Sequence, residues 1–75
     1  MTLSNSMPTV VKLSRLRSVR ERKALTQREL ATRAGVSHVT IAHIETGQTE
    51  PYPTTVRKIA LALGVEPHEL MEPES

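Results

Sequence analysis

Cysteine is absent from this chain of 75 residues, so neither a disulfide nor a thiolate metal site can stabilise it. Aromatic residues are nearly absent too, because Tyr52 is the only one. The core must then be built from Leu, Ile, Val and Ala, which suits closely packed helices and argues against a β-sandwich. No apolar run is long enough to span a membrane, and Met1–Val11 lacks the features of a signal peptide. A cytoplasmic protein is therefore the default expectation.

The net charge of the chain is small, but the charged residues are unevenly distributed along it. The formal net charge is only +2. Residues 1–44 nevertheless carry eight basic side chains and two acidic ones, whereas residues 45–75 carry two basic and six acidic. The first part suits a polyanion and the second does not. Basic residues that only solvate a helix would explain the same asymmetry, and charge alone does not decide between the two interpretations.

The length allows a single domain, near the lower limit of what folds alone. Residues 1–13 show no sustained hydrophobic period and are interpreted as a flexible arm. Residues 14–71 contain the helical patterns and form the predicted domain, in which Ser14 is expected to cap a first helix that ends at about Lys23. Residues 72–75 form an acidic tail.

The middle of the sequence predicts two short helices joined by a tight turn. Thr26 and Glu29 have the spacing of a capping box, which opens the second helix. Gly35 can adopt the left-handed conformation that ends it. Ser37 then caps a third helix over about residues 38–46, so the turn between the two helices has only about three residues. This arrangement is typical of a helix-turn-helix.

The last third of the chain predicts two further helices. Thr54 is expected to cap the fourth, whose apolar residues have the spacing of one helix face: Val56, Ile59, Ala60 and Leu63. Gly64 ends that helix. Pro67 suits the first position of a short fifth helix that carries Leu70 and Met71.

The third helix is expected to divide into a buried and an outward face. Its inner side buries Ile41 and Ile44, helped by Val36 in the turn and by the small Ala31 where the helices cross. The outward side presents a compact set: His38, Val39, Thr40, Ala42 and His43. The start of a helix pushed into the major groove of DNA presents such residues to the base edges.

A longer run of residues resembles the phage-repressor/Cro (XRE) family. The matching residues are Thr26–Ala31, Gly35-Val36-Ser37, Ile41, Ile44-Glu45, Gly47, Pro51 and Ile59–Val65. The resemblance covers roughly residues 14–71. It implies an all-α, compact five-helix, lambda-repressor-like domain, with the helix-turn-helix at its second and third helices. It also implies that the third helix enters the major groove of double-stranded DNA.

The resemblance further implies a set of DNA-contacting residues. The glutamine that opens the second helix usually touches a phosphate, and the loop after the third helix usually contacts the opposite strand. Glu50 departs from the basic character of that loop, so hydroxyl groups are expected to replace Lys or Arg there. Val39 is expected to contact a thymine methyl group. The predicted DNA-binding residues are Gln27, Arg28, Ser37, His38, Val39, Thr40, His43, Thr49, Tyr52 and Thr54.

Arg20 lies on the inward face of the first helix, where an unpaired charge would be costly. Many relatives link an arginine at this position to a glutamate that ends the recognition helix. Here that glutamate is Glu45, so the resemblance implies an Arg20–Glu45 ion pair that orients the recognition helix.

The sequence offers no sign of an enzyme, a metal site or a cofactor. His38 and His43 are five residues apart and diverge on a helix, and no carboxylate nearby completes a zinc site. Glu29 is a helix cap rather than a catalytic acid. Without paired carboxylates in an apolar cleft or a Gly-rich phosphate loop, little supports catalysis.

The predicted function is sequence-specific binding of double-stranded DNA by a transcriptional regulator, with repression favoured. One such unit contacts few base pairs, so a homodimer on two half-sites about 34 Å apart is expected. The surface through which the two copies contact each other is expected to be apolar and to lie around the fifth helix, at Leu70 and Met71. The alternative is an antitoxin or accessory subunit that acts mainly through a protein partner. A third possibility is the DNA-targeting part of a system whose ligand sensor lies on another chain.

Overall fold

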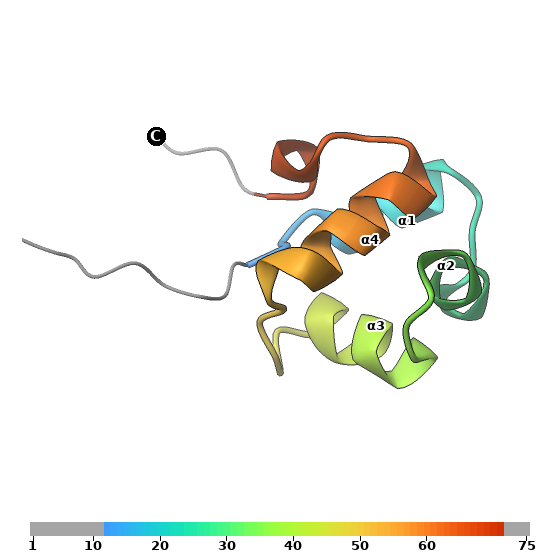
Figure 1. Cartoon of the computed structure of the whole chain (residues 1–75). Helices are drawn as coiled ribbons and strands as arrows, with labels where there is room; N and C mark the ends of the chain where they lie inside the picture. Colours follow the sequence, from blue (N-terminus) through green and yellow to red (C-terminus); the bar gives the residue numbers. More distant parts are fainter. Residues whose placement is uncertain (1–11, 72–75) are drawn as a thin grey trace, which may run out of the picture.

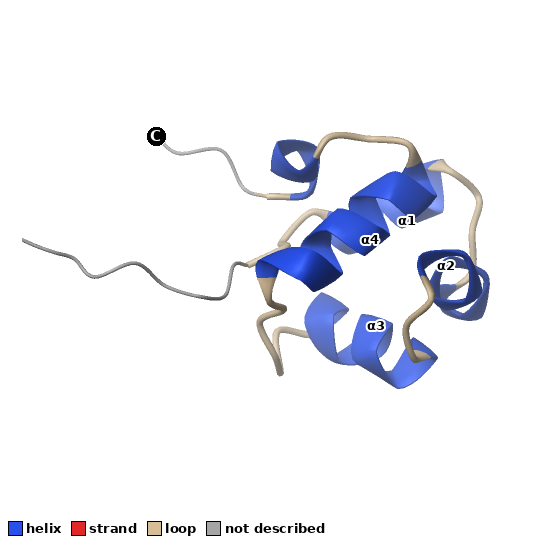
Figure 2. Ribbon diagram, viewed as in Figure 1, coloured by secondary structure: helices blue, strands red, loops and turns tan. Residues whose placement is uncertain are grey.

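A computed structural model describes residues 12–71 of the chain. Within this range it contains no strand. It has four α-helices, α1 (Leu16–Arg22), α2 (Gln27–Ala34), α3 (His38–Glu45) and α4 (Pro53–Leu63), followed by the 3-10 helix η1 (Pro67–Leu70) (Figure 2). The all-α prediction is therefore confirmed. The fifth helical element differs only in kind, because it is a single 3-10 turn rather than an α-helix.

The helices surround one aliphatic core. In Figure 1, α4 crosses the domain between η1 and α3, and α2 packs against both α3 and α4. Every helix contributes to the core, and its fully buried members are Leu16, Leu30, Ile41, Ile59 and Leu70. None of the helices in residues 12–71 is long and apolar enough to cross a membrane.

The N-terminal boundary of the packed domain lies earlier than the sequence predicts. Leu13, which the sequence analysis assigns to the flexible arm, has only 3% of its surface exposed and belongs to the core. The amide of Arg15 also donates to the carbonyl of Leu70, which holds the entry to α1 against η1. The arm therefore excludes Leu13, while residues 1–11 and the predicted acidic tail at residues 72–75 lie outside the described range.

The starts of α2 and α3 follow the predicted caps. The hydroxyl of Thr26 accepts from the amide of Glu29, and the Glu29 carboxylate accepts from the amide of Thr26, so both halves of the capping box are present. The hydrogen bond from the backbone amide of Thr26 to the Glu29 carboxylate, and then the interaction of that carboxylate with the Thr26 side chain, lower the pKa of Glu29 from its ordinary value. At α3, Ser37 accepts from the amide of Val39. Both helix starts are thus fixed by local side chains.

The predicted caps of the first and fourth helices are wrong. The N-cap of α1 is Arg15 and that of α4 is Tyr52, and neither makes a side-chain capping bond. In α4 the reason is Pro53, whose fixed φ suits the first helical position and which has no N–H to satisfy, so the helix begins before Thr54. At α1, the turn is set by the Arg15 contact with η1 rather than by Ser14.

The turn between α2 and α3 depends on Gly35. Its φ of +73° is in the left-handed region, which ends α2 as predicted. The amide of Val36 then donates to the carbonyl of Ala31 and closes the turn. Because only three residues connect the helices, α3 leaves at a steep angle to α2, as Figure 1 shows.

Candidate nucleic-acid interface

α3 has one face in the core and one face in solvent. Ile41 is fully buried and Ile44 is 5% exposed, so these two side chains hold the helix on the domain. On the outward side, Val39 is 47% exposed and His43 is also exposed. A large aliphatic side chain on an exposed helix face has a hydration cost that contact with an apolar group of a partner would remove. The remaining outward residues, His38, Thr40 and Ala42, are half-buried.

A buried carboxylate fixes the C-terminal end of α3. The Glu45 side chain has only 2% of its surface exposed. Its two oxygens accept from Arg20, with Nε–Oε2 at 2.6 Å and Nη2–Oε1 at 3.0 Å. Oε1 also accepts from Nε2 of Gln27 at 2.9 Å. We call Arg20, Glu45, Gln27 and the carbonyl of Leu25, which accepts from Nη1 of Arg20 at 2.8 Å, the Glu45 network.

The ion pair expected between Arg20 and Glu45 is therefore present and bidentate. The hydrogen bond to Glu45 raises the pKa of the Arg20 guanidinium from its ordinary value, and burial opposes this effect. The fork geometry of arginine matches a carboxylate and gives directional contacts. As a result, α1 and α3, which share few other contacts, are joined by a charged pair with defined orientation.

Gln27 opens α2, as the resemblance implies, and it also makes a contact inside the protein that the sequence analysis did not predict. It is the first residue of α2 and is half-buried, and its amide donates to Glu45. No pattern in the sequence points to this contact, because the two residues lie on different helices and their spacing is typical of no motif. A glutamine amide has two N–H donors, so the second stays available for a phosphate.

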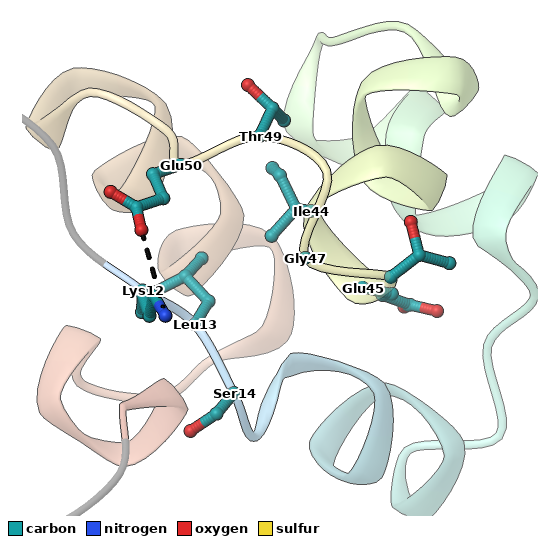
Figure 3. Close-up of a pocket in the computed structure, with 9 residues that line it drawn as sticks. Lys12, Leu13, Ser14, Ile44, Glu45, Gly47, Thr49 and Glu50 are labelled. Carbon is teal, nitrogen blue, oxygen red and sulfur yellow. Dashed lines mark ion pairs between the residues drawn. The ribbon is translucent and has the colours of Figure 1, made fainter.

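The residues predicted to contact DNA from the loop after α3 and from the start of α4 are exposed but not basic. Tyr52 is 62% exposed, and Thr49 and Thr54 are exposed as well. Figure 3 shows the carboxylate of Glu50 directed towards Lys12, and the Nζ–Oε2 distance is 4.0 Å. Because both side chains are well exposed, this pair contributes little to stability, but it partly offsets the negative charge of the loop.

The same pair lies at the edge of a groove of about 280 Å³. The groove separates the entry to α1 from the end of α3 and the following loop, and Leu13 and Ile44 contribute its apolar part (Figure 3). The sequence analysis did not predict this groove.

Two further predicted site residues are exposed at the starts of helices. Arg28 is exposed beside Gln27 at the start of α2, and Ser37 is exposed at the start of α3. In residues 12–71 there is no group of three His, Cys, Asp or Glu side chains that could hold a metal ion. The structure thus brings Gln27 and Glu45 together and leaves the histidines of α3 on its outer surface.

The fold and the site define a helix-turn-helix domain in which α3 has the position of a recognition helix. The family model described as helix-turn-helix matches residues 16–70. The chain therefore belongs to the helix-turn-helix family, of the XRE type.

Individual proteins with known names are similar to this chain. It is 44% identical over 57 residues to an HTH-type transcriptional repressor, RghR, of Bacillus subtilis, a match that covers 75% of this chain and 42% of the repressor. The chain thus spans less than half the length of that relative.

Solved structures share the fold. The restriction-modification controller protein C.AhdI from Aeromonas hydrophila is 36% identical, with a TM-score of 0.75 and coverage of 77% of this chain and 88% of that one. The P22 c2 repressor in complex with a synthetic operator is 28% identical, with a TM-score of 0.74 and coverage of 85% and 97%. These matches confirm the repressor-like fold.

Proposed function

We propose that this protein recognises a specific operator in double-stranded DNA and represses transcription, with α3 in the major groove. Its general function, DNA-binding transcriptional regulation, follows from the helix-turn-helix family, which is a family of regulators rather than enzymes. The observation that carries the finer proposal is the outward face of α3. It exposes Val39 and His43, while the opposite face is fixed by buried isoleucines and by Glu45.

The proposed contacts fall into two groups. Base edges are contacted from α3 by His38, Val39, Thr40 and His43, with Val39 against a thymine methyl group. The DNA backbone is contacted from the flanking elements by Gln27, Arg28, Ser37, Thr49, Tyr52 and Thr54. Since DNA is the proposed partner, the cytoplasm is the proposed location.

We propose a homodimer on DNA, but not through Leu70. That residue is fully buried, so its place in the predicted dimer surface is wrong, while Met71 is half-buried. Leu61 on α4 is 75% exposed and replaces it as the centre of the proposed surface.

The dimer has its own test. Sedimentation on a two-half-site duplex is expected to give two protomers per duplex for the wild type. With Leu61→Glu, we expect binding of a single protomer. If both proteins bind with the same stoichiometry, the proposed surface is wrong.

The main proposal is tested by fluorescence anisotropy with the DNA upstream of the gene and with a scrambled duplex, over about 50–200 mM salt. Preference for the native fragment that persists as salt rises is the expected result. Equal binding to both duplexes, lost as salt rises, would leave only phosphate attraction. No binding at low salt would contradict the proposal and leave the alternative, an antitoxin or accessory subunit that acts through a protein partner.

A further inference from the structure

Gln27 connects the start of α2 to the end of α3 through the buried carboxylate of Glu45. It opens α2, and its side-chain amide donates to Glu45 at the end of α3. Arg20 of α1 also donates to the two oxygens of the Glu45 carboxylate. The three helices therefore meet at a single side chain that is 2% exposed.

We propose that Gln27 is a positioning residue that determines how well the protein distinguishes its operator from other DNA. It acts by holding Glu45, and with it the orientation of α3 relative to the start of α2. The inference rests on the proposed recognition of an operator by α3, and it adds to the phosphate contact a second role, inside the protein, for the same amide.

The physical reason is that contacts to bases and contacts to the DNA backbone differ in how much they depend on the orientation of α3. Hydrogen bonds to base edges need a defined helix orientation, whereas attraction to phosphates is sequence-independent and depends mainly on charge. α3 is only eight residues long. The hydrophobic contacts of its inner face are non-directional, so the polar contacts of Glu45 supply the directional restraint.

The amide group can perform both roles at once. One N–H of Nε2 donates to Oε1 of Glu45, while the second N–H and the side-chain oxygen have no partner within residues 12–71. A phosphate that approaches the start of α2 can therefore accept the second N–H while the first stays on Glu45. In that arrangement the backbone contact and the orientation of α3 are set by the same side chain.

The test replaces Gln27 by methionine, which preserves size and helix propensity but removes the donor. The matched control is Arg28→Met, the same replacement at the neighbouring exposed residue. Affinities are measured for the duplex that the wild type selects from a random pool and for a scrambled duplex, at several salt concentrations. All measurements are made well below the unfolding midpoints, so that every variant is folded.

For Gln27→Met we expect the operator-to-scramble affinity ratio to fall about three- to tenfold, the order of one ordinary net hydrogen bond. Binding of the scrambled duplex should fall less, because that duplex loses only the sequence-independent phosphate contact. For Arg28→Met we expect both affinities to fall together and the salt dependence to become weaker, because a charge is lost. An equal loss of both affinities in Gln27→Met, or no loss, would overturn the proposed role.

A second measurement keeps this inference separate from the proposed function. In NMR spectra of the free protein, one side-chain amide proton of Gln27 should exchange slowly with water, and Glu45→Gln should alter its shift. A freely exchanging Gln27 amide would contradict the contact itself. If the wild type does not distinguish any selected duplex from the scramble, the proposed function fails before any variant is tested, and the inference fails with it.

Discussion

Arg20→Met removes the positive charge from the Glu45 network and leaves its carboxylate buried. Glu45 then keeps only the neutral donor Gln27, and the carbonyl of Leu25 loses its partner. Breaking a buried ion pair by removing one partner typically costs about 3–5 kcal/mol. Methionine fills most of the arginine volume, so the loss reports charge and hydrogen bonding more than packing.

That cost is large relative to the stability of the whole domain. A chain of 75 residues is expected to have a free energy of unfolding of about 4–11 kcal/mol. A loss of 1 kcal/mol lowers the midpoint of a domain this small by about 4–8 °C. The midpoint of Arg20→Met should therefore fall by at least about 12 °C, measured by circular dichroism at 222 nm and by urea titration.

The double variant Arg20→Met/Glu45→Met distinguishes an unpaired charge from a packing defect. With both charges gone, no buried carboxylate remains, and such replacements are often close to neutral. We expect recovery to within about 2 kcal/mol of the wild type, with the residual loss assigned to the unpaired Leu25 carbonyl. A double variant as unstable as Arg20→Met would refute the reasoning. An unchanged midpoint in either Arg20→Met or Glu45→Gln would also refute it.

Three further predictions follow from the backbone and the caps. Ala24 has a φ of +60°, which is unfavourable for a residue with a Cβ, so Ala24→Gly should raise the free energy of unfolding by about 0.5–1 kcal/mol in urea titration. Thr26→Ala should lower the thermal midpoint by about 4–8 °C through loss of a cap worth about 1 kcal/mol, whereas Ser14→Ala and Thr54→Ala should leave it nearly unchanged; equal losses in all three would contradict the cap assignment. Because the folded pKa of Glu29 is lowered, its contribution to stability is complete above the ordinary value of 4.5 and is lost as pH falls through the folded value. Glu29→Gln should accordingly flatten the acid side of the stability-versus-pH curve, and an unchanged curve would exclude this group as a source of the pH dependence.

Local signals predicted the middle of the domain well because they act within one turn. The capping box at Thr26 and the serine cap at Ser37 need only neighbouring amides, and both are present. Gly35 ends α2 because its φ is positive, which glycine alone adopts at little cost. The same logic failed at Ser14, where a contact with Leu70 from the far end of the domain sets the backbone.

Helical periodicity predicted which residues share one face of a helix, but not which part of the protein packs against that face. It placed Val56, Ile59, Ala60 and Leu63 on one side of α4, and all four are buried. It did not show that Leu70 is covered by the core and is unavailable to a partner. An apolar side chain in a short terminal element can face inward or outward, and only the packing of α4 and η1 decides between them.

By itself, the sequence determined two short helices joined by a tight turn, because caps, glycines and apolar periods act over a few residues. The resemblance to the phage-repressor/Cro family identified this pair as a helix-turn-helix. It also supported the pairing of Arg20 with Glu45. Only the tertiary structure decided that Gln27 joins this pair and that Leu61 rather than Leu70 faces solvent. The physical reason is that both depend on how separate helices are oriented, and that orientation comes from the packing of the whole core rather than from any local stretch of chain.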